Sequence, residues 1–382
     1  MKKIISFLLI FVLAFCAMCV PVGAAEFTEE ITAKSAVLMD AATGKVLFEH
    51  NADEALPPAS VTKVMTLLLV FEAIDSGALA LTDMVTASET AASMGGTQIF
   101  LEPGEKMSVE DLIKSVVISS ANDAACALAE HIAGSESAFV VKMNERAHEL
   151  GMNNTNFENT NGLDDTTKNH VISARDIAVM SRELMKHEKI FDYTTVWMDT
   201  VRGGEFGLSN TNRLLRTYSG CTGLKTGSTS KAKFCISATA KRGDLSLIAV
   251  VMGAPTRDER NALAAKMLDF GFANYAVFTE KEAPLAEIAL TGGVKNTLKI
   301  KKEGYSALLE KGEIAGIKAV TELPESVAAP VKKGDTVGTV TYKCGETVIG
   351  KANIVADEDG EKMGFFTMMW KILRLVLCAE SE

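Results

Sequence analysis

Residues 60–74 read Ser-Val-Thr-Lys-Val-Met-Thr-Leu-Leu-Leu-Val-Phe-Glu-Ala-Ile. Apolar residues fall on nearly every side of the helix that this stretch predicts, and such a helix is buried in the middle of a domain. Its first turn nevertheless carries Ser60, Thr62 and Lys63. Residues three apart share one face of a helix, so Ser60 and Lys63 are expected to meet. The stretch therefore predicts a central helix with a polar beginning.

This pair has the chemistry of a nucleophile and its base, because Ser-Lys is a known alternative to the Ser-His-Asp triad. Lysine can deprotonate serine when burial and a neighbouring cation lower its pKa from about 10.4 to near neutrality. Free amides at a helix N-terminus also favour developing negative charge. The pattern alone is weak, since Ser228-Thr229-Ser230-Lys231 repeats it and an ordinary helix cap is the alternative role for Ser60.

Two further motifs strengthen the interpretation. Ser120-Ala121-Asn122 follows Ser60 by 60 residues and lies between two predicted helices, and Lys225-Thr226-Gly227 follows after another 105 residues on a predicted strand. Each occurs once in the sequence. The three motifs in this order are typical of penicillin-binding proteins and class A β-lactamases.

The surrounding chain predicts an α/β domain whose sheet uses both its first and its last strands. Alternating apolar residues predict strands within 35–49, at 233–240 and at 245–252. Residues 108–190 predict helices, with Ser108 and Ser173 as caps, Gly134 and Gly151 as ends, and a polar loop over 151–173. Residues 258–275 predict a last helix. We place this domain at residues 26–281 and a small all-β domain, rich in turn signals, at 282–356.

The N-terminus is expected to be removed rather than folded. Two lysines, an apolar run over 4–20 and the small residues Gly23-Ala24-Ala25 predict a signal peptide at 1–25, and a short transmembrane helix is the alternative. Export to the outer face of a bacterial cytoplasmic membrane follows from this prediction. Removing two lysines and no acids changes the net charge from −10 to −12, which disfavours nucleic acid as a partner. The one CxxC pair, Cys16 and Cys19, lies within the predicted signal peptide, and the chain after residue 25 contains none. No His cluster stands at ligand spacing and the five His share no motif, so we expect neither a metal nor a cofactor.

The C-terminal segment 361–382 predicts an amphipathic anchor. Residues 365–378 place Thr367, Lys371 and Arg374 on one helical face among apolar residues. Fourteen residues make about 21 Å of helix, shorter than the ~30 Å hydrocarbon core of a bilayer. We therefore expect a helix that lies in the membrane interface, the alternative being a helix packed on the β domain.

The chain resembles low-molecular-mass penicillin-binding proteins, the D-alanyl-D-alanine carboxypeptidases, from end to end. The similar segments are Pro58–Thr66, Ser119–Ala124, Asn161–Leu163, Ser173–Asp176, Gly223–Gly227 and Val250–Ala254. The resemblance implies a β-lactamase/transpeptidase-like fold, an antiparallel sheet flanked by helices with a helical subdomain. It also implies removal of the terminal D-alanine from peptidoglycan stem peptides, and inhibition by β-lactam antibiotics.

The resemblance further implies the role of each motif residue. Ser60 attacks the carbonyl of the penultimate D-alanine, Lys63 is the base, and Ser120 relays a proton to the leaving D-alanine. Asn122 holds Lys63 and the substrate amide. Lys225 supplies the positive potential that keeps Lys63 neutral.

The resemblance also implies which residues bind the substrate, and most of them follow Lys225 in the chain. Thr226 and Arg260 are expected to hold the terminal carboxylate. The alternative is that Arg260 is a surface arginine, and the nearby Arg257 is the other candidate for binding the carboxylate. Gly227 and Ser228 are expected to line the site, and the amides of Ser228 and of the nucleophile to form the oxyanion hole. The family more often has Thr or His at the position of Ser228. Only the backbone amide of this residue is expected to contact the substrate, so the side-chain difference should have little effect.

Three alternatives stay open at the level of sequence. A class A-like β-lactamase would use Glu158 to activate water, but such enzymes end after the last helix, and this chain continues for some 100 residues. A catalytically silent wall-binding scaffold would not need the intact motifs. Cys221 and Cys235 lie symmetrically about residue 228, so a hairpin centred there would allow a disulfide, with two free buried thiols as the alternative.

Overall fold

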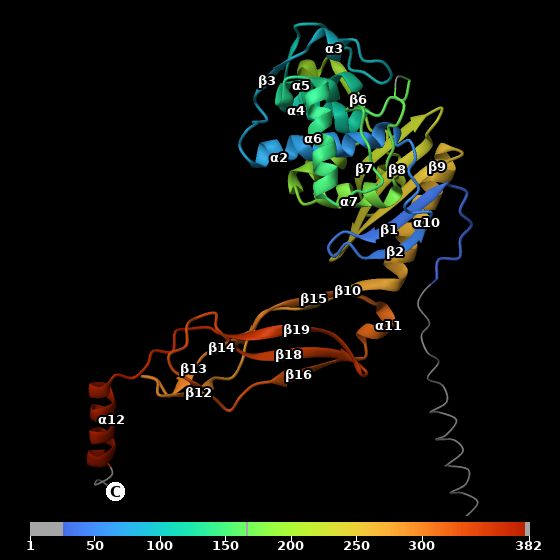
Figure 1. Cartoon of the computed structure of the whole chain (residues 1–382). Coiled ribbons are helices and arrows are strands. Elements are labelled where there is room, and N and C mark those ends of the chain that lie inside the picture. The colour runs from blue at the N-terminus through green and yellow to red at the C-terminus, as the bar shows by residue number, and fades with distance from the viewer. Residues whose placement is uncertain (1–25, 166, 379–382) are drawn as a thin grey trace, which may run out of the picture. The chain divides into compact units, whose positions relative to one another are not determined.

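The structure, a computed structural model, describes residues 26–165 and 167–378. The described chain divides into two compact units, Glu26–Ala273 and the residues from Asn274 onward (Figure 1). The predicted signal peptide lies outside the described residues, as do residues 379–382 of the predicted anchor.

The first unit is built on a five-stranded antiparallel sheet with the order β2-β1-β9-β8-β7. These strands are β1 (Ser35–Asp40), β2 (Val46–His50), β7 (Cys221–Thr229), β8 (Lys233–Arg242) and β9 (Leu245–Ala254). β1 pairs with β9 across more than 200 residues of sequence, with Ala36 opposite Val251. The prediction that the sheet combines the first and last strands is confirmed.

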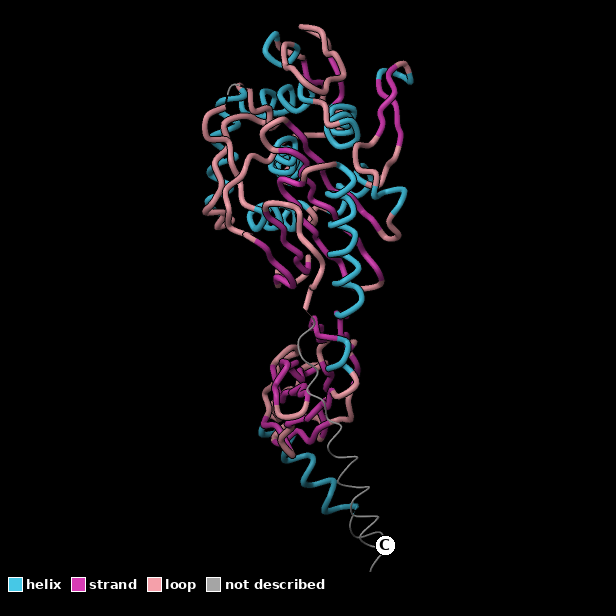
Figure 2. Tube along the Cα trace, turned by 90° about the vertical axis from the view of Figure 1, so that its right-hand side faces the viewer, coloured by secondary structure: helices cyan, strands magenta, loops and turns pink. Residues whose placement is uncertain are grey.

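Helices cover both faces of this sheet, as the two views in Figures 1 and 2 show. On β1, Val37 and Met39 belong to the main apolar core with the central helices, whereas Leu38 points to the opposite face. There α10 (Arg257–Asn274) packs so closely that a Cβ on Gly271 would lie 2.5 Å from Leu247 and 3.2 Å from Leu38. The period-two alternation of β1 thus serves two separate apolar layers.

The predicted buried helix is the centre of the helical part. It begins as a 3₁₀ turn, η1 (Ala59–Thr62), and continues as α2 (Lys63–Asp75), in which Lys63–Leu68, Val70 and Phe71 are buried. It packs against α5 (Asn122–Ala133), α6 (Glu136–Glu149) and α7 (Ala174–Leu184). Burying each of its Val, Leu and Phe side chains contributes about 1.5–3 kcal/mol, so the helix holds the domain together.

Local signals placed the ends of several elements correctly. The Ser108 hydroxyl accepts from the Asp111 amide at the start of α4 (Val109–Lys114), and the Ser173 hydroxyl accepts from the Asp176 amide at the start of α7. Gly134 ends α5 and Gly151 follows α6, both at positive φ. The remaining elements of this unit are short: β3 (Met84–Thr86), α3 (Glu89–Ala92), β4 (Lys106–Ser108), η2 (Ser115–Ser119), η3 (Glu188–Ile190), α8 (Phe191–Thr194), β5 (Met198–Val201), η4 (Arg202–Gly204), β6 (Phe206–Ser209) and α9 (Leu214–Thr217).

The second unit is rich in strands, and it begins earlier than predicted. Its main sheet has the order β11-β14-β19-β18-β16, beside the pair β10-β15 and the three strands β13-β12-β17. Their bounds are β10 (Tyr275–Glu280), β11 (Ala283–Pro284), β12 (Ile288–Thr291), β13 (Thr297–Leu298), β14 (Ile300–Lys302), β15 (Tyr305–Glu310), β16 (Ile317–Glu322), β17 (Ser326–Ala328), β18 (Thr336–Cys344) and β19 (Thr347–Ala356), with α11 (Lys311–Ile314) after β15. We expected residues 275–281 in the first domain, but β10 pairs along its whole length with β15. The strand pairing therefore moves the boundary to residue 274.

The C-terminal helix α12 spans Phe365–Cys378, the residues predicted from the sequence. Phe365, Phe366 and Trp370 are among its exposed apolar side chains. Among the helices of residues 26–165 and 167–378, none is both long and apolar enough to cross a membrane.

The possible disulfide between Cys221 and Cys235 is wrong. The β7–β8 turn is centred near residue 231 rather than 228, so Gly227 lies opposite Cys235, and Cys221 lies opposite Ala240. Both thiols are free, and burial raises the pKa of each above its ordinary value. The alternative of two free thiols is therefore correct, although only Cys235 is fully buried and Cys221 is partly exposed.

Candidate active site

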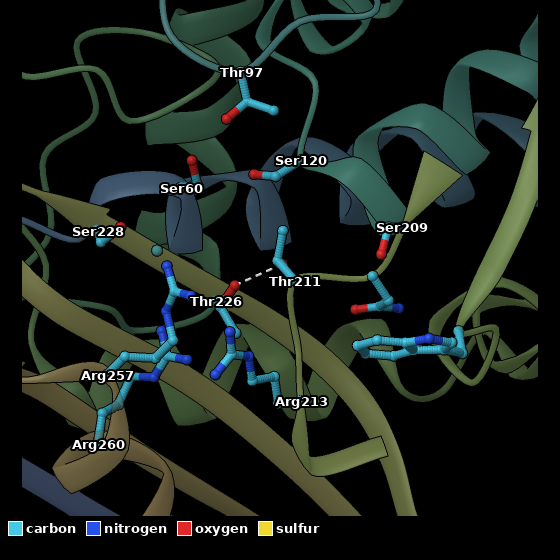
Figure 3. A pocket seen from close by; sticks show the side chains of 13 residues that line it. Ser60, Thr97, Ser120, Ser209, Thr211, Arg213, Thr226, Ser228, Arg257 and Arg260 are labelled. Atoms are coloured by element: carbon cyan, nitrogen blue, oxygen red, sulfur yellow. Dashed lines mark hydrogen bonds between the residues drawn. The ribbon is translucent and has the colours of Figure 1, made fainter. Parts of the chain in front are cut away.

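Three segments far apart in sequence bring their polar residues to one cleft of about 420 Å³ (Figure 3). Ser60 comes from η1, Ser120 from the connection between η2 and α5, and Thr226 and Ser228 from β7. Ser120 has φ +66°, a left-handed conformation that reverses the chain between the two helical segments. All three predicted motifs therefore meet.

Gly227 allows β7 to approach the turn that carries the nucleophile. A Cβ at this position would lie 2.8 Å from the Ser60 amide nitrogen and 2.9 Å from the Pro58 carbonyl oxygen. No side chain larger than hydrogen fits there without a shift of main chain. The glycine of Lys225-Thr226-Gly227 thus places the strand edge beside the amide of Ser60.

Lys63 is completely buried and its amine faces three oxygen atoms. Nζ lies 3.0 Å from Ser60 Oγ, 2.5 Å from Asn122 Oδ1 and 2.8 Å from the Asn161 carbonyl oxygen. The two carbonyl-type oxygens can only accept, so the two N–H groups of a neutral amine serve them. Its lone pair is then left for the hydroxyl proton of Ser60.

The surroundings favour this neutral form. Burial lowers the pKa of Lys63 well below its ordinary value, the positive charge of Lys225 lowers it further, and the negative charge of Asp123 opposes both. Asp123 itself accepts from the amides of Ile99 and Leu101 at 3.1–3.2 Å and so holds the segment beside the cleft.

Lys225 donates a hydrogen bond to the second serine hydroxyl of the site, that of Ser120. Its buried Nζ donates to Ser120 Oγ at 2.8 Å and to the Thr226 carbonyl at 2.9 Å. Burial, aided by the nearby charge of Arg260, lowers the pKa of Lys225 to about 7. Two lysines with lowered pKa values therefore flank two serines, an arrangement suited to proton transfer near neutral pH.

The far end of the cleft is strongly basic. Arg213, Arg257 and Arg260 gather beside Thr226 in Figure 3. Arg260 is 2% exposed, which excludes the alternative of a surface arginine. Among the described residues, its guanidinium donates to the neutral oxygens of Asn261 and Cys235. A buried cation without an anionic partner is costly, so this end is prepared for an anion.

Several contributors were missed at the level of sequence. Thr211 lies 2.7 Å from Thr226, hydroxyl oxygen to hydroxyl oxygen, and Arg213 lines the cleft from the same loop. Neither belongs to a recognisable motif. Asn161 belongs to a segment that resembles the family, but it accepts from Lys63 through its backbone carbonyl, and a backbone group leaves no side-chain pattern in the sequence.

Glu158, the candidate water-activating residue of the β-lactamase alternative, is placed elsewhere. Its side chain is exposed, and its two carboxylate oxygens accept from the amides of Lys168 and Asn169. Within the described chain, the residues that line the cleft include no Asp or Glu. Glu158 thus stabilises the loop to which it belongs and does not line the cleft.

Comparison with known proteins now identifies the family. Residues 22–256 match the family described as D-alanyl-D-alanine carboxypeptidase, and residues 275–362 match the penicillin-binding protein 5 C-terminal domain. The chain belongs to the D-alanyl-D-alanine carboxypeptidase family. It is therefore a serine peptidase of the low-molecular-mass penicillin-binding proteins, as the sequence predicted.

Individual relatives in this family cover nearly the whole chain. The D-alanyl-D-alanine carboxypeptidase DacF of Bacillus subtilis is 43% identical over 97% of both chains, and DacC of Escherichia coli is 36% identical over 92% of this chain and 91% of its own length. The structure of penicillin-binding protein 5 from Haemophilus influenzae matches with a TM-score of 0.72 and 34% identity, over 88% of this chain and 100% of that one. These matches confirm the predicted fold class, including the all-β C-terminal region.

Replacing Lys225 by Gln should raise the pKa of Lys63, because it removes the positive charge that destabilises the charged Lys63 amine. The titration of Lys63 can be followed by the ¹³C chemical shift of its Cε in lysine-labelled protein. Lys142→Gln, at an exposed lysine of α6 that does not line the cleft, is the matched control. An unchanged Lys63 titration in Lys225→Gln would contradict the electrostatic role of Lys225.

Proposed function

We propose that the chain removes the terminal D-alanine from peptidoglycan stem peptides through an acyl-enzyme on Ser60. The observation that carries the proposal is the buried Lys63 amine, 3.0 Å from Ser60 Oγ, beside a cleft whose other end is lined by Arg213, Arg257 and Arg260. A peptide that ends in a free carboxylate has its scissile carbonyl one residue away from that anion. This matches a site with a nucleophile at one end and arginines at the other.

The acylation step follows from the hydrogen bonds. Lys63 takes the hydroxyl proton as Ser60 Oγ bonds to the carbonyl carbon of the penultimate D-alanine. The resulting oxyanion is held by the amides of Ser60 and Ser228, which flank the close approach at Gly227. Collapse of the intermediate breaks the peptide bond, and Ser120, hydrogen-bonded to Lys225, delivers a proton to the leaving amine of D-alanine. Water then hydrolyses the ester and regenerates Ser60.

Binding residues complete the proposal. Thr226, oriented by Thr211, and Arg260 hold the terminal carboxylate, and the bound anion stabilises the charged form of Lys225. Asn122 orients Lys63 through its carbonyl oxygen while its amide group donates to the Gly95 carbonyl at 2.7 Å. Asn122 is thus a firmly held positioning residue.

β-lactam antibiotics are proposed as inhibitors that acylate the same serine. Penicillin-binding protein D2 of Listeria monocytogenes, seen in ampicillin-bound and cefotaxime-bound forms, is 32% and 31% identical over 64% and 65% of this chain and 100% of its own, with TM-scores of 0.59 and 0.57. The cleft-lining residues among those described include no carboxylate, so the glutamate-activated water by which class A β-lactamases deacylate is missing, and a penicilloyl ester on Ser60 should be hydrolysed more slowly than in those enzymes. This favours a carboxypeptidase over a β-lactamase.

For location, we propose that the enzyme is exported and held on the outer face of the cytoplasmic membrane by α12. The support is the sequence of residues 1–25 and the exposed apolar side chains of α12, whose 14 residues suit an interfacial helix. Lys371 and Arg374 would add about 1 kcal/mol each at an anionic surface.

Replacing Ser60 by Ala should lower carboxypeptidase activity by about a thousandfold or more and abolish covalent labelling by a fluorescent penicillin, since both begin with the same attack. Ser230→Ala, an exposed serine of the β7–β8 turn, is the control and should label normally. Mass spectrometry that locates a penicilloyl group on Ser228 rather than Ser60 would refute the assignment.

Replacing Arg260 by Ala should lower kcat/KM by about 10–100-fold for a peptide with a free C-terminal carboxylate, and by much less for the amidated peptide. The ratio of the two rates within one variant cancels any loss of folded protein. Arg257→Ala, the exposed neighbour, is the comparison. Equal losses on both substrates in Arg260→Ala would indicate a purely structural arginine.

A chain that ends at Gly360 should lose binding to anionic vesicles while turning over small peptides at the normal rate, because α12 is remote from the motif residues in sequence and supplies none of them. High salt should release little of the longer protein, since salt screens charge and leaves the apolar contribution intact. If the protein without residues 1–25 but with α12 fails to sediment with such vesicles at low salt, the proposed anchor is wrong.

A further inference from the structure

His170 is a buried side chain to which the mechanism above gives no role. It is 5% exposed and lies edge-on to the buried ring of Phe157, in the loop that ends before α7. Both ring nitrogens have partners: the Glu158 amide donates to Nδ1 at 2.9 Å, and Nε2 lies 2.7 Å from Thr62 Oγ1. Thr62 is part of the Ser60–Lys63 turn, so this histidine reaches the nucleophile's own segment.

The direction of each hydrogen bond follows from the backbone. An amide N–H can only donate, so Nδ1 must be the accepting nitrogen, and the ring proton resides on Nε2. Nε2–H then donates to Thr62 Oγ1, and the Thr62 hydroxyl donates to the Ala59 carbonyl at 2.9 Å. Burial lowers the pKa of His170 to about 4 against the opposing fields of Glu158 and Asp164, which preserves the neutral ring. The result is a one-way chain from the Glu158 amide to the Ala59 carbonyl.

The carbonyl at the end of this chain lies in a strained turn. Ala59 has φ +49°, a conformation that costs a non-glycine residue about 1–3 kcal/mol and persists only where the surroundings enforce it. Gly162 packs directly against this carbonyl group, since a Cβ at residue 162 would lie 1.8 Å from the Ala59 carbonyl oxygen. Thr62 and Gly162 together therefore fix the position of this oxygen.

Fixing that oxygen also fixes the amide of the nucleophile. The Ala59 carbonyl and the Ser60 N–H belong to one planar peptide group and point in opposite directions. An error in the carbonyl orientation therefore becomes an equal error in the direction of the Ser60 N–H, which stands beside Gly227. Donors of an oxyanion hole act only when they are aimed in advance.

We propose that His170 is a positioning residue that aims the Ser60 amide at the oxyanion through Thr62 and the Ala59 carbonyl. The proposal rests on the proposed function, because it assigns the Ser60 amide to the oxyanion hole. The essential link is the hydrogen bond from Nε2 to Thr62, and the bond at Nδ1 serves to set the tautomer.

Two matched pairs of variants test the link. Gln offers a donor near the position of Nε2 and Asn an acceptor near that of Nδ1, so His170→Gln keeps the link to Thr62 and His170→Asn loses it. Likewise Thr62→Ser keeps the hydroxyl, and Thr62→Val removes it with little change of shape. His148→Gln, on the exposed face of α6, is the control.

The measurement is the second-order rate constant of acylation by a fluorescent penicillin, with the labelled fraction and the melting temperature of each variant. We expect His170→Asn and Thr62→Val to acylate about 10–100-fold more slowly, and His170→Gln and Thr62→Ser to recover most of the rate. Equal rates in His170→Asn and His170→Gln, or losses explained entirely by a smaller labelled fraction, would overturn the proposal.

A second measurement does not depend on activity. The ¹⁵N chemical shifts of the His170 ring should show the proton on Nε2 at neutral pH, and a proton on Nδ1 would overturn the proposal whether or not penicillin reacts. If the unaltered protein is not labelled by penicillin, the proposed function fails instead, and the ring shifts still decide the direction of the hydrogen-bond chain.

Discussion

A lysine amine enclosed by protein, with oxygen atoms of neutral groups as its hydrogen-bond partners, is the constraint on which the rest of the site depends. Charging Lys63 would place a cation in a nearly dry interior, 3.0 Å from a hydroxyl and next to two carbonyl-type oxygens. The charged form is further penalised by Lys225. The same burial that makes α2 the centre of the core therefore makes its first residue a base, so stability and reactivity share one cause.

The Lys63 amine is buried because three chain segments pack around it. Each segment needs a strained backbone conformation or a glycine that allows a close main-chain contact. Ser120 adopts a left-handed conformation, Gly227 allows a strand to approach η1 without a side chain, and Gly162 packs on the strained Ala59. Such features are costly locally and persist because the surrounding helices and sheet enforce them. The helical part and the sheet are thus both needed to form one cleft.

The charge distribution along the cleft separates binding from chemistry. Arg213, Arg257 and Arg260 concentrate positive potential at one end, whereas the two lysines near the serines have lowered pKa values. A substrate carboxylate bound by the arginines would reduce their repulsion of Lys225 and favour its charged form. In the proposed function, substrate binding and the protonation of Lys225 would therefore be coupled.

The sequence alone determined the parts of this protein that depend on local pattern. An all-apolar helix with a polar first turn, three motifs in order, helix caps at Ser108 and Ser173, and two strands around the turn at 241–244 are all encoded within a few residues, and the structure contains each of them. Tertiary structure alone decided the rest. The carbonyl of Asn161 serves Lys63 across 98 residues, and His170 reaches Thr62 across 108, through contacts that leave no mark in local spacing. The register of β7 on β8 separated Cys221 from Cys235, and the pairing of β10 with β15 moved the domain boundary, because strand partners are chosen by the packing of the whole sheet rather than by the strand itself.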